Sequence, residues 1–444
     1  MKKKLVFLFF LLGIFLGCSR SSGEKITILF TNDLQGRAVP YPEKRGGLAR
    51  IAQVVKEIRA ENPNTILLDA GDFSVGSALA THSRGEAIVR IMNAVGYSAG
   101  VYGNHEFDLG KEQARRYQEI ARFPILACNL RDEQGRAFAP EYAIFQLGSF
   151  RLAVVGVANP RTPNLVNPSG ISGLSFLPAE AEVRRVQHQL SGKADLIILL
   201  THQGIAEDTK LAYQLKAIPL IIGGHSEIAI NGLRKVKGVK IAQAGHFGWW
   251  LGRIDFYWHP KEKKASGFKA RLIKITKRIP PDPEVEKLIL EQEKILPRNI
   301  DRVIGRTWRT LSKDYLGYWL AELLKKYTGS EFGIINTGGV RSKIFRGKIT
   351  PRMIYYVMPF QDRVCKFELS GKKLLRLKSA RHLYFSRGPG IEWDRSYQVG
   401  SIDFLLKINE FPGAETPVIY PELFRDIIIK QIEQNRGIKF FWAK

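Results

Sequence analysis

Cysteine is scarce in this sequence, with three residues in a chain of 444. Cys18 belongs to an apolar N-terminal segment, while Cys128 and Cys365 lie far apart, in strands that the apolar pattern predicts for different domains. Neither of these two has the spacing of a metal ligand. A disulfide between them is possible in an oxidising compartment but is not expected, and zinc-finger spacing is absent.

Acidic residues are also few: 42 Asp and Glu stand against 68 Lys and Arg, a formal net charge of +26. Such an excess suits an anionic partner, namely nucleic acid, an anionic membrane or a phosphorylated substrate, although it also serves solubility. The sequence has no RNA-binding sheet motif and no heptad repeat. Nucleic acid is therefore the weaker interpretation, and a basic adhesin or nucleic-acid binder would depend on charge alone.

The one long apolar run lies at the N-terminus, where three lysines precede the stretch from Leu5 to Leu16. This stretch is too short for an ordinary membrane span and is typical of a secretion signal. It ends in FLGC, which resembles a bacterial lipoprotein signal with Cys18 as the lipidated first residue. Because the residues before Gly17 are bulky, ordinary secretion or an uncleaved anchor stay open. We predict a signal over residues 1–18 and a periplasmic or cell-surface protein, anchored to the membrane by lipid on Cys18.

A chain of this length predicts two or three domains. Residues 24–275 alternate short, continuous apolar runs with amphipathic helical segments, which indicates an α/β domain with buried strands. Residues 279–299 open with three prolines and predict a linker helix. Residues 300–444 mix helices with strand-like runs and predict a second, smaller α/β domain. There is no internal repeat and no low-complexity tract.

Polar side chains follow five of the predicted strands of the first domain, where each strand ends. In layered α/β sheets the carboxyl ends of the strands form the edge where ligands bind. Oxygen and imidazole donors together suit manganese, zinc, iron or magnesium. The residues in question are Asp33, Asp72, Asn104 with His105 and Glu106, His202, and His225 with Glu227.

Taken singly, each of these positions has an ordinary explanation. Asp72 alone could cap a helix, Asn104 alone could sit in a turn, and His202 or His225 alone could be structural. Five such positions, each after a strand and each followed by glycine or a polar turn, are hard to explain in this way. We interpret them as one metal site.

The motifs TND, GD, GNHEFD, TH and GGH, in this order, resemble the calcineurin-like metallophosphoesterase superfamily. More narrowly, they are similar to the secreted bacterial 5′-nucleotidase and UDP-sugar hydrolase family, over about residues 24–410. The most specific part is GNHEFDLG, residues 103–110. The second domain contributes NTGGVR, residues 336–341, and MPF, residues 358–360. The resemblance implies a layered β-sandwich flanked by helices, followed by the smaller substrate domain.

The resemblance also implies a role for each matching residue and a pair of divalent metal ions as cofactors. Asp33 would bind the first metal, and Asp72 would bridge both. Asn104, His202 and His225 would hold the second metal. The catalytic pair would be His105 and Asp108, in which Asp108 orients and charge-stabilises the imidazole; alternatively, Asp108 caps the following helix.

Two positions of the metal site depart from the family pattern. Gln35 stands where the family usually has His, and Glu227 stands where it usually has His or Gln. An amide oxygen binds divalent metal less well than imidazole, whereas a carboxylate binds hard cations better, so Glu227 could restore the first site. The more oxygen-rich site would favour manganese, magnesium or iron over zinc, manganese first. The alternatives are a lost first metal and, for Glu227, a solvated turn residue.

The second domain departs further from the family, since no GGDG motif follows residue 404. Asn336 and Arg341 belong to the NTGGVR motif, and Arg341 can bind a phosphate or carboxylate bidentately or form a surface ion pair. Phe360 matches one of two rings that hold a nucleobase. Phe404 is the weaker match for the other, on a strand from Tyr397, and packing in the core is its favoured explanation. Residues 341–387 hold 13 Lys and Arg against two acids, which suits an anionic substrate.

The sequence therefore predicts a secreted hydrolase of small phosphate esters, with nucleotides or nucleotide sugars as the first expectation and no nucleic-acid partner. Water activated by the two metals would attack phosphorus directly, and no motif for a nucleophilic serine or cysteine is seen. Two alternatives remain: a substrate-binding lipoprotein with a degenerate metal site, and a related sulfur-oxidation thiosulfohydrolase.

Overall fold

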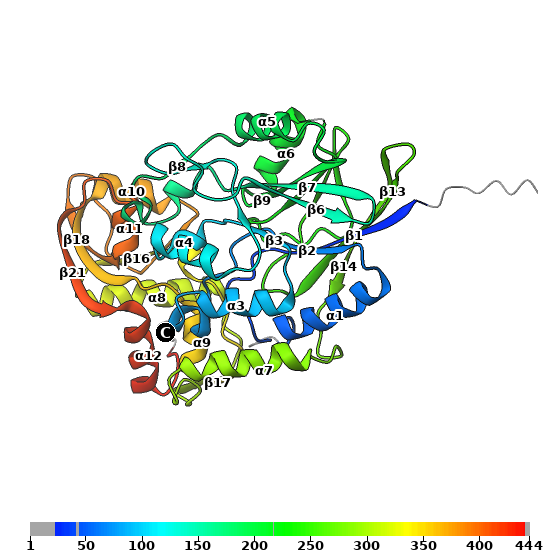
Figure 1. Cartoon of the computed structure of the whole chain (residues 1–444). Coiled ribbons are helices and arrows are strands. Elements are labelled where there is room, and N and C mark those ends of the chain that lie inside the picture. The colour runs from blue at the N-terminus through cyan, green and yellow to red at the C-terminus, as the bar shows by residue number, and fades with distance from the viewer. Residues whose placement is uncertain (1–22, 41–43, 216, 440–444) are drawn as a thin grey trace, which may run out of the picture.

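The computed structural model describes residues 23–40, 44–215 and 217–439. The chain forms two domains that lie side by side, with the blue-to-green first part and the yellow-to-red second part in contact along one flank (Figure 1). The predicted signal and Cys18 lie outside the described residues. Within the described part, no helix combines the length and apolar character needed to cross a membrane.

Two mixed sheets of six strands each form the centre of the first domain, among the residues described. Within each sheet, the strands that precede the candidate ligands run parallel to one another. The first sheet has the order β14 (Lys264–Lys274), β13 (Trp250–His259), β1 (Glu24–Thr31), β2 (Thr65–Asp69), β3 (Ala99–Val101), β4 (Ile125–Leu126). The second has the order β11 (Arg234–Val236), β12 (Val239–Ala242), β10 (Leu220–Gly223), β9 (Leu196–Thr201), β7 (Phe150–Val157), β6 (Tyr142–Leu147). A short pair, β5 (Leu130–Arg131) and β8 (Ser175–Phe176), lies outside both sheets.

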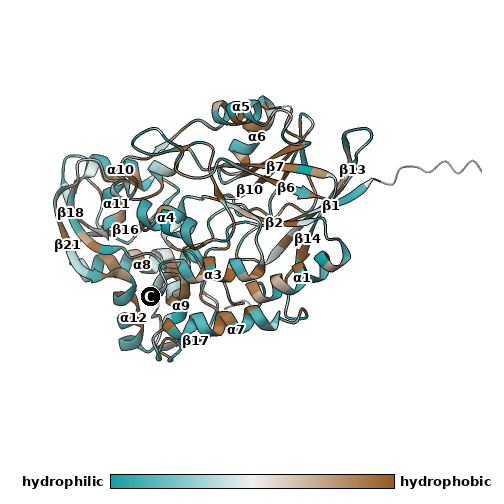
Figure 2. Cartoon of the chain, in the orientation of Figure 1, coloured by the Kyte–Doolittle hydropathy of each residue, from teal (hydrophilic) through white to brown (hydrophobic). Residues whose placement is uncertain are grey.

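The two sheets pack face to face over a shared apolar core. Alternate residues of the strands enter it, for example Ile28 and Leu68 from the first sheet and Val154 and Leu200 from the second. The other faces of the same strands are buried under helices, which explains why the strands are apolar along their whole length. Figure 2 shows the brown strands enclosed between helices whose outer sides are teal. The predicted layered sandwich flanked by helices is confirmed.

Helices cover the outer face of each sheet and give the first domain its four layers. One group of helices shares a core with the first sheet, and a second group shares a core with the other sheet. The first group is α1 (Leu48–Glu61), α2 (Ala78–His82), α3 (Glu86–Val95), α4 (Lys111–Ile120) and α7 (Pro283–Gln292), and the second is α5 (Ala179–Gln189) and α6 (Ile205–Gln214).

The predicted linker helix is α7, and it is packed rather than exposed between the domains. Asp282 caps its N-terminus by accepting from the N–H groups of Glu284 and Val285. Val285 and Ile289 enter the core beneath α1 and α3. The first domain thus holds the chain firmly up to the point where it enters the second domain.

Within the described residues, the second domain has one five-stranded sheet, which is surrounded by helices, and a hydrophobic core of its own. Gly333 of β16 (Phe332–Asn336), an inner strand of this sheet, lies against the backbone of α8 (Lys313–Thr328). The strand order is β19 (Leu383–Phe385), β16 (Phe332–Asn336), β20 (Ser396–Ile402), β18 (Arg363–Ser370), β21 (Glu415–Leu423). The helices are α8 (Lys313–Thr328), α9 (Pro351–Val357), α10 (Gly371–Lys378), α11 (Asp403–Lys407) and α12 (Phe424–Asn435), with a ribbon of β15 (Gly305–Thr307) and β17 (Gly347–Ile349).

Two local predictions are wrong. Cys128 lies in a turn between β4 and β5 instead of a strand, because β4 ends after two residues at Leu126. Phe404 lies in the helix α11 instead of a strand, since β20 ends at Ile402 and the helix starts at Asp403. Cys128 and Cys365 are both buried thiols, and neither forms a disulfide within the described residues.

The contact between α8 and β16 yields a stability prediction. A methyl group on Gly333 would collide with the backbone carbonyl of Ala321 in α8. Gly333→Ala should therefore force the helix away from the sheet and cost about 1–3 kcal/mol. Calorimetry should show a lower unfolding temperature. The matched control is Gly390→Ala, where an added methyl meets nothing within 4 Å; equal melting of the two variants would contradict the packing described.

Candidate active site

The carboxyl ends of parallel strands from both sheets meet at one edge of the first domain. Asp33 follows β1 and Asp72 follows β2, while His202 and His225 follow β9 and β10 of the other sheet. Oxygen and nitrogen atoms of Asp72, His202 and His225 lie within 4.8 Å of one another. The side chains that the sequence identified as separate motifs are thus brought together.

The loops that carry these residues adopt strained backbone conformations. Asp33, Gln35, Asp72, His225 and Glu227 all have positive φ angles, between 51° and 71°. Non-glycine residues rarely adopt this region, and such strain concentrates at functional sites. The neighbouring glycines are needed for space: a methyl group on Gly71 would lie 2.8 Å from Nδ1 of His202.

Asp33 is fully buried. One of its carboxylate oxygens accepts hydrogen bonds, and the other has no described donor. Its Oδ2 accepts from Nδ2 of Asn32 at 2.7 Å and from the backbone N–H of His225 at 2.9 Å. Its Oδ1 has no hydrogen-bond partner among the described residues. Burial raises the pKa of Asp33 to about 7, although His202 opposes the shift and Asp72 adds to it.

Asp72 lies at the centre of the cluster. Its Oδ1 accepts from the backbone N–H of His105 at 2.9 Å, and its Oδ2 lies 3.0 Å from Nε2 of His202. Nδ1 of His202 is 2.6 Å from the carbonyl oxygen of Ala70, which directs Nε2 toward the carboxylates. Burial works against ionisation of Asp72, but His202 and His105 outweigh it and hold its pKa well below the usual range.

The residues fit divalent metal ions. Buried Oδ1 atoms of Asp33 and Asn104 have no hydrogen-bond partner in the described structure. Leaving a buried polar atom without a partner costs free energy, so a cation bound beside these two oxygen atoms would stabilise the site. Imidazole nitrogen from His202 and His225 and oxygen from three other side chains form a donor set suited to transition metals.

Glu106 fixes the loops of this site, a role that the sequence analysis did not assign. Its buried carboxylate accepts from the backbone N–H groups of Asp72, Phe73, Ser74 and Gly103, at 2.8–3.1 Å, and from the Ser74 hydroxyl. One carboxylate therefore joins the loops after β2 and β3. The GNHEFD motif contains this glutamate, but the sequence does not show that its carboxylate is buried among backbone N–H groups.

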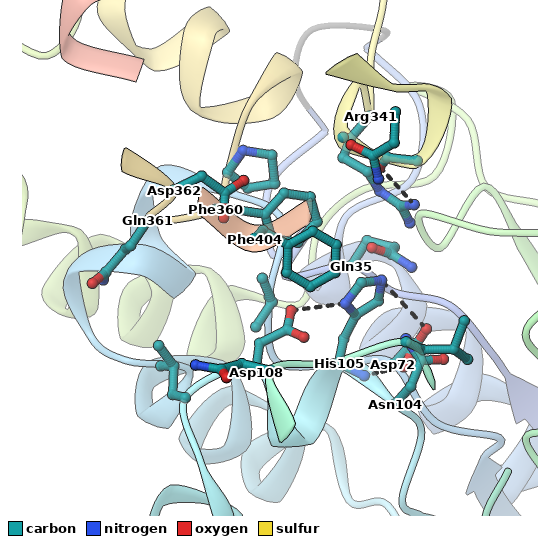
Figure 3. Close-up of a pocket in the computed structure, with 18 of the residues that line it drawn as sticks. Gln35, Asp72, Asn104, His105, Asp108, Arg341, Phe360, Gln361, Asp362 and Phe404 are labelled. Carbon is teal, nitrogen blue, oxygen red and sulfur yellow. Dashed lines mark hydrogen bonds and ion pairs between the residues drawn. The ribbon is translucent and has the colours of Figure 1, made fainter. Parts of the chain in front are cut away.

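His105 and Asp108 form the expected pair. Nδ1 of His105 lies 2.8 Å from Oδ2 of Asp108, while Nε2 lies 3.9 Å from Oδ2 of Asp72 (Figure 3). Burial lowers the pKa of His105, but Asp108 and Asp72 outweigh burial and raise it to about 9. The phenyl ring of Phe360, from the second domain, stacks on the imidazole with centroids 5.7 Å apart.

Glu227 pairs with the second domain. Its Oε1 lies 3.2 Å from Nη2 of Arg341, and its Oε2 lies 3.6 Å from Nδ1 of His246. Gln35, at the other departure from the family pattern, is buried, and its Nε2 has no hydrogen-bond partner in the described chain. Both side chains line the same cavity as Asp33.

A cavity of about 360 Å³ lies between the domains and over the metal-ligand cluster. The structure brings every candidate to it except His202 and Glu106, which are both fully buried. Figure 3 shows second-domain side chains above those of the first domain. The cavity is lined by the candidates Asp33, Gln35, Asp72, Asn104, His105, Asp108, His225, Glu227, Asn336, Arg341, Phe360 and Phe404, and by Asn164, Asn167, Gln361, Asp362 and Lys407, which the sequence analysis missed.

Two known domain families match the chain. The calcineurin-like phosphoesterase family matches residues 26–227, and the 5′-nucleotidase C-terminal domain family matches residues 299–410. The chain therefore carries a calcineurin-like phosphoesterase domain followed by a 5′-nucleotidase C-terminal domain. It is accordingly a hydrolase that acts on phosphate esters, and the resemblance seen in its motifs is confirmed.

Named relatives resemble this phosphoesterase along most of its length. The 5′-nucleotidase of Vibrio cholerae is 27% identical over 411 residues, covering 79% of this chain and 74% of the relative. Protein UshA of Escherichia coli is 27% identical over 413 residues, covering 79% of this chain and 75% of the relative.

Solved structures share the two-domain fold of this phosphoesterase. The 5′-nucleotidase precursor of Thermus thermophilus superposes with a TM-score of 0.86 at 21% identity, covering 94% of this chain and 97% of that one. The sulfate thiohydrolase SoxB of the same organism reaches 0.83 at 20% identity, covering 94% and 95%. At these identities the likeness establishes the fold alone.

Replacing Glu106 should weaken metal binding although the side chain holds no metal. Glu106→Gln puts amide hydrogens against backbone N–H groups and loosens the loops of Asp72 and Asn104. We expect metal affinity to fall about 10- to 100-fold, the usual cost of losing a supporting contact. Titration of the metal-free protein with Mn²⁺ measures this. The exposed Glu112→Gln is the control, and unchanged affinity in Glu106→Gln would contradict the role.

Metal binding should release protons. Burial lowers the pKa of His202, but Asp72 outweighs burial and raises it to about 10 in the metal-free protein. The imidazole is therefore protonated at neutral pH, and Nε2 must lose its proton to bind metal. Affinity should rise with pH up to the pKa of His202. Calorimetric titration in buffers of different ionisation enthalpy checks this; heats independent of the buffer would refute it.

Proposed function

We propose that this protein hydrolyses small phosphate monoesters or diesters, with nucleotides or nucleotide sugars as substrates, at a pair of divalent metal ions. The observation that carries the proposal is the convergence of Asp33, Asp72, Asn104 and His225 on a cavity that the second domain closes with Arg341. The names of the relatives support a nucleotide substrate.

The donor set supports two metal positions that share Asp72. Asp33 and Gln35, with Glu227 when it leaves Arg341, would hold the first metal, and the remaining donors would hold the second. Bound divalent cations, with manganese favoured, would supply Lewis acidity toward a phosphoryl oxygen and a water molecule of lowered pKa. The second-metal donors are Asn104, His202 and His225.

The side chains of this chain supply the proton and the positioning. In the metal-free protein, Asp108 and Asp72 raise the pKa of His105 to about 9, which favours the protonated ring, and Nε2 would donate its proton to the leaving-group oxygen. Asp108 accepts from Nδ1 and keeps the ring in place. Arg341 and the rest of the basic second domain favour an anionic substrate. Asn336 and Phe404, across the cavity, would contact its leaving group.

The cell location and domain limits are part of the same proposal. The N-terminal segment supports secretion with a lipid on Cys18, which would place the enzyme at a membrane surface in the periplasm or outside the cell. We propose domain limits at residues 24–275 and 300–444, with residues 279–299 as the link.

The test is hydrolysis of an aryl phosphate and a nucleotide panel by metal-free protein restored with Mn²⁺, Zn²⁺, Mg²⁺ or Fe²⁺. We expect metal-dependent turnover that Asp72→Ala abolishes. His105→Gln should lower kcat by about 10²- to 10⁴-fold with metal content unchanged, because it removes only the proton donor.

A substrate-binding protein with a degenerate site is the competing interpretation, and the contact between Glu227 and Arg341 favours it. It predicts nucleotide binding without turnover under every metal. That result, with correctly folded protein and one metal or none per chain, would reject the hydrolase.

A further inference from the structure

A carboxylate without a partner faces the second-domain end of the cavity. Asp362 is half-buried and lines the cavity, yet no described donor forms a hydrogen bond or ion pair with its side chain. The nearby Lys407 donates instead to Asp403, at 2.6 Å. A half-buried carboxylate normally has a donor, so this one is available to a ligand.

The backbone around Asp362 is fixed by contacts that leave its side chain unused. Nη1 of Arg425 donates to the carbonyl oxygens of Pro359 and Phe360, at 3.0 and 3.2 Å. The carbonyl oxygen of Asp362 accepts from the N–H of Phe424 at 2.9 Å. The N–H of Arg363 donates to Asp403, also at 2.9 Å. These hydrogen bonds hold the backbone of the segment in place, so the position of Asp362 at the cavity is fixed.

Aromatic surface lies beside this carboxylate. Phe360 is two residues before Asp362, and Figure 3 shows both on one segment across from His105. Phe404 lines the same cavity. Phenyl rings offer area to any planar ring and do not distinguish one base from another. Discrimination must come from polar side chains of the cavity wall, and Asp362 is a carboxylate beside Phe360 that no described donor satisfies.

We propose that Asp362 determines base specificity, selecting a purine that presents two adjacent N–H donors on one edge, as guanine does. The proposal rests on the proposed function, because it assigns the leaving group of that reaction. An ionised carboxylate has two acceptor oxygens and no donor. The N1–H and 2-amino groups of guanine match this pair.

Other bases fit the carboxylate less well. Adenine places an acceptor, N1, beside its amino group, and this acceptor would face a carboxylate oxygen. Hypoxanthine keeps the N1–H donor but lacks the 2-amino group. Burial, with Asp403 and Asp108 nearby, raises the pKa of Asp362 to about 7. The carboxyl group is therefore ionised in mildly alkaline buffer, where binding should be compared.

The experiment measures binding of guanosine, inosine, adenosine and 2′-deoxyguanosine to the purified protein by calorimetry in such a buffer. Nucleosides carry no phosphate, so the result does not depend on turnover. A well-placed bidentate pair discriminates between bases by about 10- to 100-fold. We expect guanosine to bind at least about 10-fold more tightly than adenosine, with inosine between them and 2′-deoxyguanosine equal to guanosine.

Asp362→Asn should remove the preference, because an amide offers one acceptor and opposes the second donor. Gln361→Ala, a neighbour lining the same cavity, is the matched control and should keep it. Equal binding of guanosine and adenosine to the unaltered protein would overturn the proposal. So would loss of affinity for 2′-deoxyguanosine, which would assign the carboxylate to the ribose. Turnover of aryl phosphate with no base preference would reject this inference and leave the proposed function intact.

Discussion

The hydrogen bonds that the Glu106 carboxylate accepts are the constraint on which the geometry of the site depends. This carboxylate holds four backbone N–H groups from two loops, so Asp72 and Asn104 keep their positions although the backbone at Asp72 is strained. Without such donors a buried carboxylate would be prohibitively unstable, and without the carboxylate the loops would lose their common anchor. The positions of the proposed metal ligands Asp72 and Asn104 thus depend on a residue that is not one of them.

Charge explains why the site needs cations. Asp33, Asp72 and Glu106 are buried within one small region, and Asp69 lies beneath them with a pKa raised by burial. In the metal-free protein, the protonated His202 offsets part of this negative charge. Divalent cations would replace that proton and satisfy the open oxygens of Asp33 and Asn104. The negative charge of the proposed ligands and the chemistry of the proposed reaction therefore both favour bound divalent cations.

The second domain completes the site from the other side of the cavity. Phe360 covers the imidazole of His105, and Arg341 reaches Glu227 at the metal edge. Both contacts join residues far apart in sequence. They bring the second-domain part of the cavity, which Asp362 lines, over His105, the proposed proton donor.

Much of this could be predicted from sequence because the signals are local. Buried strands are continuous apolar runs, and Asp33, Asp72 and His225 follow them immediately, so the fold and the cluster of ligands follow from strand ends meeting at one edge. The pairing of Glu227 with Arg341 could not be predicted, since it depends on how two domains dock. Asp362 was missed because the sequence does not show that its carboxylate lacks a hydrogen-bond donor. Phe404 was assigned to a strand because the direct change from β20 to α11 after Ile402 leaves no mark in the hydrophobic pattern.

The most direct test of this account is the anomalous scattering of crystals grown with Mn²⁺. The account predicts two peaks on either side of the Asp72 carboxylate, one beside Asp33 and one between His202 and His225. A single peak, or none with the protein folded and the ligands in place, would contradict a two-metal centre.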